Sequence, residues 1–487
     1  MRFHHVLVLI ASALVQLVPT SHGARAQLRA APQPPLTDAA TYAAIRDKAL
    51  ASSWAYERLS DLTDLIGPRL SGSVQAQAAV EQVAAVMRGE GLKVTLEPMQ
   101  APRWVRGEER AELIEYAQRP KGITQSLKLT TLGGSVATPA QGISAEVLVV
   151  KSFADLSARA HQAKGRIVVF DVPFDQALAE NGLAGAAYGQ VVAYRVGGAS
   201  AAAKVGALAA LVRGAGGADY RLLHTGMMAY EDGVPKIPTA ALTAEDVGLI
   251  TRLAKRGPVT MRLLLTPEQH PDVQSFNVVG ELTGAQKPNE VVIVSGHLDS
   301  WDLGTGAVDD GTGVVAALGA ARVLRELKLR PKRSVRVIAY MSEEVGAVGG
   351  RAYFEAHKGE LANIRAVIET DSGAGSPLGF EAYALPEALP KLRSLQEVLA
   401  PTGANHIRRS ERPVGADISA WETAGVPGFE TLLDGRHYFD IHHTPADTLD
   451  KVDRKNLARI VATVAVLTYH LADTPEPPSH LPPLPQP

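Results

Sequence analysis

The chain is 487 residues long, carries 49 basic against 51 acidic side chains and contains no cysteine. At about 150 residues per domain, this length predicts two or three domains with enough chain for a large core. The hydrophobic content of 46% excludes a disordered chain, the net charge of −2 gives no electrostatic reason to expect nucleic acid or an anionic membrane as a partner, and the missing cysteines exclude disulfides and thiolate chemistry.

Residues 1–26 have the pattern of a secretory signal peptide. Arg2 supplies the positive start, Val6–Val18 is a nearly unbroken apolar run, and Ala24–Ala26 has the small-x-small pattern of a cleavage site. The apolar run is too short to span a bilayer, which takes about 20 residues. We therefore expect an exported protein, secreted or periplasmic, with no membrane partner after cleavage.

The next two stretches differ in character. Across residues 42–92 apolar side chains recur at helical spacing, and we assign residues 27–119 to the N-terminal part of a catalytic domain. Residues 120–265 instead alternate short β-rich runs, such as Val147–Val150, with Gly/Ala-rich stretches, and they hold no cluster of histidines and acids. We interpret residues 120–265 as an inserted domain.

Residues 266–472 alternate strands and helices regularly. The predicted strands are Val291–Ser295, Val335–Met341 and Ala366–Thr370, and the predicted helices are Gly313–Leu327 and Gly349–His357. This order is typical of an α/β domain built on a largely parallel sheet. The final stretch, residues 473–487, is rich in proline and is expected to be an extended, disordered tail.

Clusters of histidines and acids lie in this last domain where strands end. They are His297 with Asp299, Asp309 with Asp310, Glu343 with Glu344, Asp371, and His442 with His443 and Asp447. In an open α/β sheet, ligands bind at the carboxyl ends of the strands. We therefore expect these side chains to meet at one edge of the sheet.

Each cluster alone has an ordinary interpretation: Asp309 or Asp310 as a helix cap, Glu343 and Glu344 as a solvated turn, His297 as a core histidine, His442 and His443 as a surface pair. Together they draw only on His, Asp and Glu, and a set of three carboxylates and two imidazoles suits a pair of zinc ions with one carboxylate shared. Two adjacent glutamates let one bind metal while the other takes a proton from water. A serine hydrolase is unsupported because no G-x-S-x-G elbow occurs.

The motifs GHLDSWD, DDGTG, SEE, ETDSG and HHTPADT, in this order and spacing, resemble those of the co-catalytic zinc exopeptidase family of aminopeptidases and glutamate carboxypeptidases. Flanking segments such as IGPRLSGS and YEDGVPKIPTAALTAEDV narrow the resemblance to one glutamate carboxypeptidase subfamily. It covers about residues 42–472. It implies a zinc-exopeptidase α/β fold, with a mixed, mostly parallel central sheet flanked by helices, an inserted β-rich domain of the protease-associated type, and a homodimer.

The resemblance also implies a role for each site residue. One zinc ion would be bound by His297 and Asp371, the other by Glu344 and His443, with Asp309 bridging both; Glu343 would be the general base, and Asp299 would accept the second ring N–H of His297. A cis peptide bond is implied at Asp309–Asp310. The implied reaction is hydrolysis of dipeptides or short peptides with free termini, by Glu-assisted attack of a zinc-bridging water.

Two other functions remain open at this point. A glutaminyl cyclase-like enzyme would keep the scaffold with one zinc ion, and a receptor-like binding ectodomain would keep it with none. The recognised peptide terminus is also open. Three arginines in the loops that bracket the site are candidates to bind a substrate carboxylate, but we expect them to be solvated surface residues: Arg408, Arg409 and Arg436.

Overall fold

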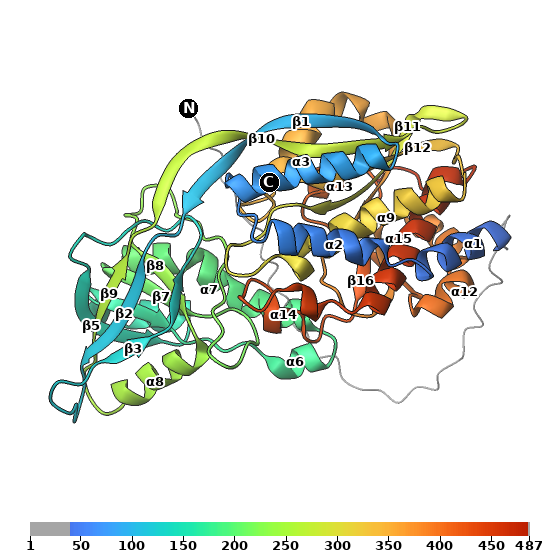
Figure 1. The fold of residues 1–487 in the computed structure, drawn as a ribbon. Helices are drawn as coiled ribbons and strands as arrows, with labels where there is room; N and C mark the ends of the chain where they lie inside the picture. The colour runs from blue at the N-terminus through green and yellow to red at the C-terminus, as the bar shows by residue number, and fades with distance from the viewer. Residues whose placement is uncertain (1–38, 486–487) are drawn as a thin grey trace, which may run out of the picture.

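The computed structural model describes residues 39–485, and the expected signal peptide lies outside the described residues. Two eight-stranded sheets form two bodies that lie side by side (Figure 1). The first sheet has the order β1 (Lys93–Val105), β10 (Glu268–Leu282), β12 (Arg333–Tyr340), β11 (Lys287–His297), β13 (Ile364–Glu369), β16 (Gly428–Leu433), β14 (Pro377–Tyr383), β15 (His406–Ser410).

The centre of this first sheet is parallel, as expected from the strand–helix–strand order. β12, β11, β13 and β16 pair in parallel, whereas β1, β10 and β14 add antiparallel pairs. The three predicted strands correspond to β11, β12 and β13, with the last two ending one residue earlier than predicted, and the two predicted helices correspond to α9 (Thr312–Glu326) and α10 (Val348–His357). The mixed α/β architecture is therefore confirmed.

Helices cover both faces of this sheet because its central strands are apolar on both sides. In β11, Val292 and Val294 face one core, whereas Val291 and Ile293 face the other. The first core is covered by α1 (Ala39–Leu50), α2 (Trp54–Leu65), α3 (Val74–Gly89), α9 and α15 (Arg454–Asp473) (Figure 1). The second lies under α10 and α13 (Ser419–Thr423), where Tyr353 and Trp421 are buried.

The second sheet forms a separate body, built from the part of the chain that follows β1 and precedes β10 in the sequence. Its order is β3 (Gln125–Leu127), β2 (Glu109–Glu115), β9 (Thr260–Leu265), β5 (Ile143–Val150), β6 (Ile167–Phe170), β7 (Ala209–Arg213), β8 (Thr239–Leu242), β4 (Leu129–Thr131). Its helices are α4 (Phe153–Ala158), α5 (Ala160–Ala163), α6 (Gln176–Glu180), α7 (Ala184–Lys204) and α8 (Ala244–Ala254). We call residues 109–265 the inserted body; it begins upstream of the expected start at residue 120.

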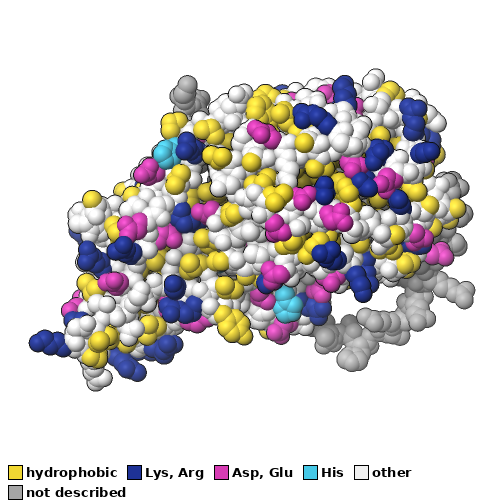
Figure 2. Space-filling model, viewed as in Figure 1, with side chains coloured by type: hydrophobic (Ala, Val, Ile, Leu, Met, Phe, Trp, Pro, Cys, Tyr) yellow, Lys and Arg dark blue, Asp and Glu magenta, His cyan; other side chains and the backbone are white. Residues whose placement is uncertain are grey.

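The remaining helices are short and lie in the C-terminal half: α11 (Leu389–Arg393), α12 (Gln396–Leu399) and α14 (Tyr438–Ile441). Among residues 39–485, no helix is both long and apolar enough to cross a membrane. On the face shown in Figure 2, basic and acidic side chains are interspersed rather than gathered by sign.

The proline-rich tail corrects one expectation. Residues 474–485 are extended, but they are held against the first body. The N–H of Leu481 donates to Gly425 O at 2.7 Å, that of Leu484 donates to Thr423 O at 2.8 Å, and His480 Nε2 lies 2.8 Å from Ile364 O. Prolines have no N–H, but the residues between them do, and these bonds order the tail.

Candidate metal centre

The clustered side chains meet at the carboxyl edge of the parallel strands, as the sequence predicts. His297 is the last residue of β11, Glu343 and Glu344 follow β12, and Asp371 follows β13. Because these three strands are parallel neighbours, their ends bring the side chains together. The turn Ala307–Gly311 before α9 supplies Asp309, and the segment after α14 supplies His443.

Asp309 lies between two groups of potential metal ligands. Its Oδ1 is 3.1 Å from His297 Nε2, which is also 3.6 Å from Asp371 Oδ1. Its Oδ2 is 3.2 Å from His443 Nε2, which is also 2.9 Å from Glu344 Oε2. In each group the ligand atoms lie within 4.8 Å of one another. One carboxylate oxygen of Asp309 therefore faces each group.

The donor set fits divalent metal ions. Asp309 Oδ2 and Glu344 Oε1 are buried without a hydrogen-bond partner among the described residues. Buried polar atoms in native proteins nearly always have a partner, so a bound metal ion would supply the partner that these two oxygens lack. Carboxylates and imidazoles without thiolates form the donor set of catalytic zinc.

Burial is the main influence on the pKa values of these acids. It raises the pKa of Glu344, with partial compensation from His443, and that of Asp371, with partial compensation from His297. Burial also favours a high pKa for Asp309, but His442, His297 and His443 outweigh it and hold that pKa well below its ordinary value. Such crowding of buried acids is relieved by nearby positive charge.

Glu343 differs from its neighbour because it belongs to neither ligand group. Burial raises its pKa well above the ordinary value; His297 opposes the shift, and Asp371 adds to it. Its backbone N–H donates to Asp299 Oδ1 at 3.0 Å, and the N–H of Glu344 donates to Asp299 Oδ2 at 3.3 Å. Asp299 therefore holds the turn that carries both glutamates.

This geometry corrects the role implied for the Asp299 carboxylate. His297 Nδ1 lies 3.0 Å from the backbone carbonyl of Asp299 but 3.7 Å from its Oδ1. A carbonyl can only accept, so Nδ1 carries the proton and Nε2 is left to face Asp309. The carbonyl thus orients the ring, while the carboxylate binds the glutamate turn.

Two further acids hold the turn around Asp309. Asp310 accepts the N–H groups of His297 at 3.0 Å and Gly313 at 2.9 Å, and Asp447 accepts those of Val308 at 2.7 Å and Asp309 at 3.2 Å. The Asp309–Asp310 peptide bond is cis, as the resemblance implies. These acids therefore bind backbone rather than face the ligand groups.

The inserted body contributes contacts to His443 that the sequence did not reveal. His443 Nδ1 lies 3.3 Å from Thr225 O, and the N–H of Thr225 donates to His443 O at 3.0 Å. Arg195, from α7, places Nη1 3.4 Å from His443 Nδ1 and donates to Tyr188 Oη at 2.6 Å. His224 packs against His443 at a ring-centroid distance of 5.5 Å. No cluster of histidines and acids in the sequence marked these residues, since His224 stands alone in its segment and Arg195 lies in a Gly/Ala-rich helix.

Arg408 and Arg436 are confirmed as exposed surface residues, whereas Arg409 is half-buried and also donates to Ala384 O; all three have local acidic partners. Arg408 binds Glu381, Arg409 binds Glu411, and Arg436 binds Asp434. His442 is not a surface residue: it is 7% exposed and its ring stacks on that of His443 at 3.6 Å.

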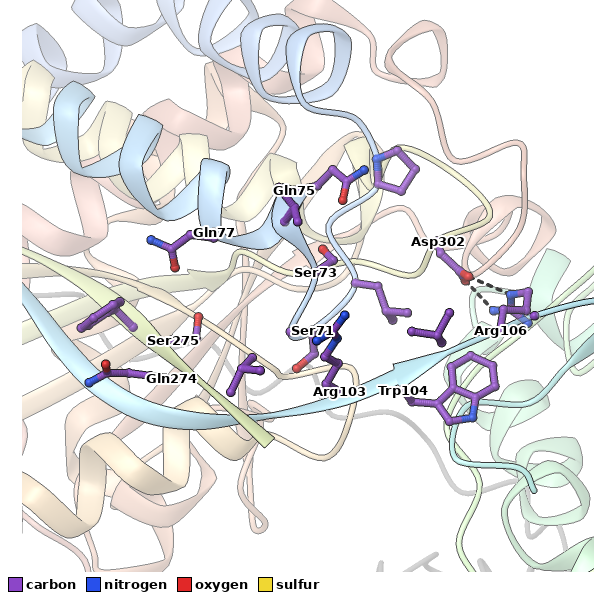
Figure 3. A pocket seen from close by; sticks show the side chains of 18 residues that line it. Ser71, Ser73, Gln75, Gln77, Arg103, Trp104, Arg106, Gln274, Ser275 and Asp302 are labelled. Carbon is purple, nitrogen blue, oxygen red and sulfur yellow. Dashed lines mark hydrogen bonds and ion pairs between the residues drawn. The ribbon is translucent and has the colours of Figure 1, made fainter. Parts of the chain in front are cut away.

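A cavity of about 850 Å³ lies beside the centre rather than on it. Figure 3 shows its lining from the start of α3, from β1 and from β10. None of the predicted site residues lines it. Ser71 in its wall is 2.6 Å from Ser342 Oγ, next to Glu343, and Arg106 binds Asp302 at its edge (Figure 3).

Comparisons with known proteins agree with this geometry. The profile of "Peptidase family M28" matches residues 277–468. The chain is 40% identical to carboxypeptidase Q of Xenopus laevis and of Homo sapiens over 428 residues, which is 88% of this chain and 87% of each relative. These relatives agree with the subfamily expected from the flanking segments.

Solved structures show the same architecture. The peptidase M28 precursor from Shewanella amazonensis matches with a TM-score of 0.86 at 36% identity, over 92% of this chain and 99% of that one. A zinc aminopeptidase from Bacillus subtilis matches with a TM-score of 0.63 at 20% identity, over 87% and 95% of the two chains, and shows the shared fold.

Proposed function

Because this chain belongs to peptidase family M28 and is a zinc metallopeptidase of the carboxypeptidase Q type, we propose that it uses two zinc ions to hydrolyse dipeptides or short peptides with free termini. The observation that carries the proposal is the position of Asp309, with one oxygen toward each ligand group. A single-metal enzyme would need only one of these groups.

We assign His297 and Asp371 to one zinc ion, Glu344 and His443 to the other, and Asp309 to both. The distances within each group and the unpartnered oxygens of Asp309 and Glu344 support this assignment. When bound, zinc supplies a Lewis acid and lowers the pKa of water from about 16 to about 7.

Glu343 would move the protons of the reaction. It would take a proton from the attacking water and pass it to the leaving amine. A general base works best with a pKa near the working pH, and burial moves the Glu343 carboxyl in that direction. Asp299 would support it by fixing the backbone N–H of Glu343.

The test is a panel of dipeptides with free, N-blocked and C-blocked termini, assayed on samples whose zinc content is measured. We expect hydrolysis of the free dipeptides at two zinc ions per chain, lost on chelation and restored by zinc. One zinc ion per chain without hydrolysis of the free dipeptides would favour the cyclase-like alternative. No bound zinc and no hydrolysis of any member would favour a binding ectodomain.

The setting of the enzyme is proposed on separate grounds. Residues 1–26 would be a signal peptide for export to the periplasm or the exterior, residues 27–119 and 266–472 would form the catalytic domain, and the inserted body would be of the protease-associated type. A homodimer is proposed from the family resemblance. N-terminal sequencing of the mature protein checks the first proposal, and light scattering during size-exclusion chromatography checks the last.

A further inference from the structure

We propose that the loop of residues 66–73, which joins α2 to α3, positions two parts of the metal centre. Arg69 positions the segment that carries Asp309, and Ser71 positions the turn that carries Glu343. Neither Arg69 nor Ser71 belongs to a ligand group, so both are positioning residues. The loop is the IGPRLSGS segment, for which the resemblance to the exopeptidase family implies no role.

The side chain of Arg69 is fully buried and donates to backbone carbonyls. Its Nε donates to Leu298 O at 2.7 Å. Its Nη1 donates to Thr305 O at 2.6 Å and to Gly67 O at 3.1 Å, and its Nη2 donates to Gly306 O at 2.9 Å. One guanidinium therefore holds both ends of the segment 298–306.

The backbone of Arg69 binds the middle of the same segment. The N–H of Arg69 donates to Ser300 Oγ at 3.0 Å, and the N–H of Ser300 donates to Arg69 O at 3.3 Å. The segment 298–306 runs from just after His297 to the turn that carries Asp309. Fixing it therefore sets how these two potential metal ligands face each other.

The form of the Arg69 side chain matters as well as its charge. Burial lowers its pKa to about 10, although Asp447, Asp299 and Asp310 oppose the shift, so the group is charged at neutral pH. A guanidinium has five donors in a planar fork and can bind carbonyls on several sides, whereas an ammonium is a compact point charge. A lysine would therefore keep the charge but lose the link between the two ends of the segment.

Ser71 acts on the turn that carries the glutamates. Its Oγ lies 2.6 Å from Ser342 Oγ, and both residues are buried. Because Ser71 donates its one hydroxyl hydrogen to Pro102 O at 2.9 Å, Ser342 is the donor in the pair. Ser342 has a φ of +68°, which is uncommon outside glycine, and it directly precedes Glu343. The bond therefore supports the backbone conformation from which the Glu343 side chain projects.

The first experiment titrates full-length, chelator-stripped chain with Zn²⁺ against a chelating indicator. Arg69→Lys should bind zinc about 10–100-fold more weakly, as is typical when a partner that orients metal ligands is lost, and turnover should recover at saturating zinc. Ser300→Ala, which removes the acceptor of the Arg69 N–H, is a milder second variant with the same expected direction. Arg333→Lys is the matched control: Arg333 is also fully buried and donates to Thr474 O at 2.6 Å, but it lies at the start of β12, away from the centre.

The second experiment measures dipeptide hydrolysis at saturating zinc. Ser71→Ala should keep the zinc affinity of the wild type and lose about 10–100-fold in kcat, because a small displacement of a reacting group is costly. Ser342→Ala removes the same bond, so the double variant should lose no more than either single variant. Ser334→Ala is the matched control, since Ser334 is fully buried and donates to Pro288 O at 2.7 Å.

A merely structural loop would not separate these two losses. The proposal is overturned if Arg69→Lys and Ser300→Ala both bind zinc as the wild type does, or if Ser71→Ala keeps its kcat. It is also overturned if the matched controls lose as much, or if the two serine losses add in the double variant. The inference rests on the proposed function in treating Asp309 as the shared zinc ligand and Glu343 as the base. A wild type that binds fewer than two zinc ions or hydrolyses no dipeptide would contradict that function instead.

Discussion

The two sides of the metal centre are built differently. On the His297 side, His297 ends β11 and Asp371 follows β13, and these two strands are paired in parallel in one sheet. On the His443 side, Glu344 follows β12, but His443 lies on a loop and is contacted by Thr225 and Arg195 of the inserted body. The first side is positioned by regular secondary structure, whereas the second depends on a contact between two bodies.

Asp309 joins the two sides, so its removal should have the largest effect. Asp309→Ala deletes the oxygen that faces each ligand group. We expect loss of both zinc ions and a fall in kcat/KM of more than about 10⁴-fold, because metal-ion catalysis contributes several kcal/mol and each 1.36 kcal/mol is tenfold in rate. Metal content and dipeptide hydrolysis measure this.

The control for that variant is Asp450→Ala, which removes an exposed acid paired only locally with Lys451. If Asp309→Ala lost one zinc ion and kept the other at full affinity, Asp309 would serve a single side. The two sides would then have no ligand in common.

Glu343→Ala should leave both sides intact and still stop turnover. Glu343 belongs to neither ligand group, so we expect two zinc ions to remain bound. Loss of a general base typically costs about 10²–10⁴-fold in rate. Activity within about tenfold of the wild type, at equal zinc content, would show that another residue takes the proton. Glu355→Ala, at an exposed acid on α10, is the matched control.

Gly226→Ala should weaken the His443 side alone. Gly226 has a φ of +141°, and a Cβ there would collide with the guanidinium of Arg195. Partners that orient a metal-binding histidine typically account for about 10–100-fold in metal affinity. We expect one of the two zinc ions to bind about tenfold more weakly while the other keeps its affinity, as measured by titration with a chelating indicator.

Gly233→Ala provides the comparison for backbone strain. Gly233 also lies in the inserted body with a positive φ, of +79°, but nothing surrounds its missing Cβ. Equal weakening of zinc binding in both variants would mean that strain in the inserted body, rather than displacement of Arg195, disturbs His443. Unchanged zinc affinity in both would make the inserted body irrelevant to that side.

The smallest expected effect is on the pH dependence of folding stability, and it comes from Glu422, which belongs to neither ligand group. Burial raises the pKa of Glu422 to about 8, although the N–H groups of Val414 and Gly415 oppose the shift. The folded state therefore holds a proton more tightly than the unfolded state, whose pKa is near 4.5. Its contribution to stability is full below pH 4.5 and is lost as the pH rises to about 8.

Glu422→Gln removes this titration and tests that sign. We expect the Tm of the variant relative to the wild type to rise by about 2 °C or more between pH 5 and pH 9. The same change should be seen with and without chelator, because Glu422 belongs to neither ligand group. If the Tm of the variant instead fell relative to that of the wild type as the pH rose, the pKa of Glu422 would not be raised in the folded state.

The part of the centre that lies at strand ends could be predicted from the sequence. The apolar runs that form β11, β12 and β13 are followed directly by His297, Glu343, Glu344 and Asp371, and strand ends meet wherever strands are parallel neighbours. The prediction did not determine which atom of Asp299 orients His297, because the carbonyl and carboxylate lie within reach of the same ring.

The amino-acid sequence by itself determined the strand–helix order, the donor types of the centre and its place at the strand ends, because these follow from local periodicity and from motifs of a few residues. Only the tertiary structure decided that Thr225, Arg195 and His224 reach His443, and that the proline-rich tail is held in place. The Thr225–His443 contact spans 218 residues. Such a contact depends on how two separately folded bodies meet, and no local pattern encodes that.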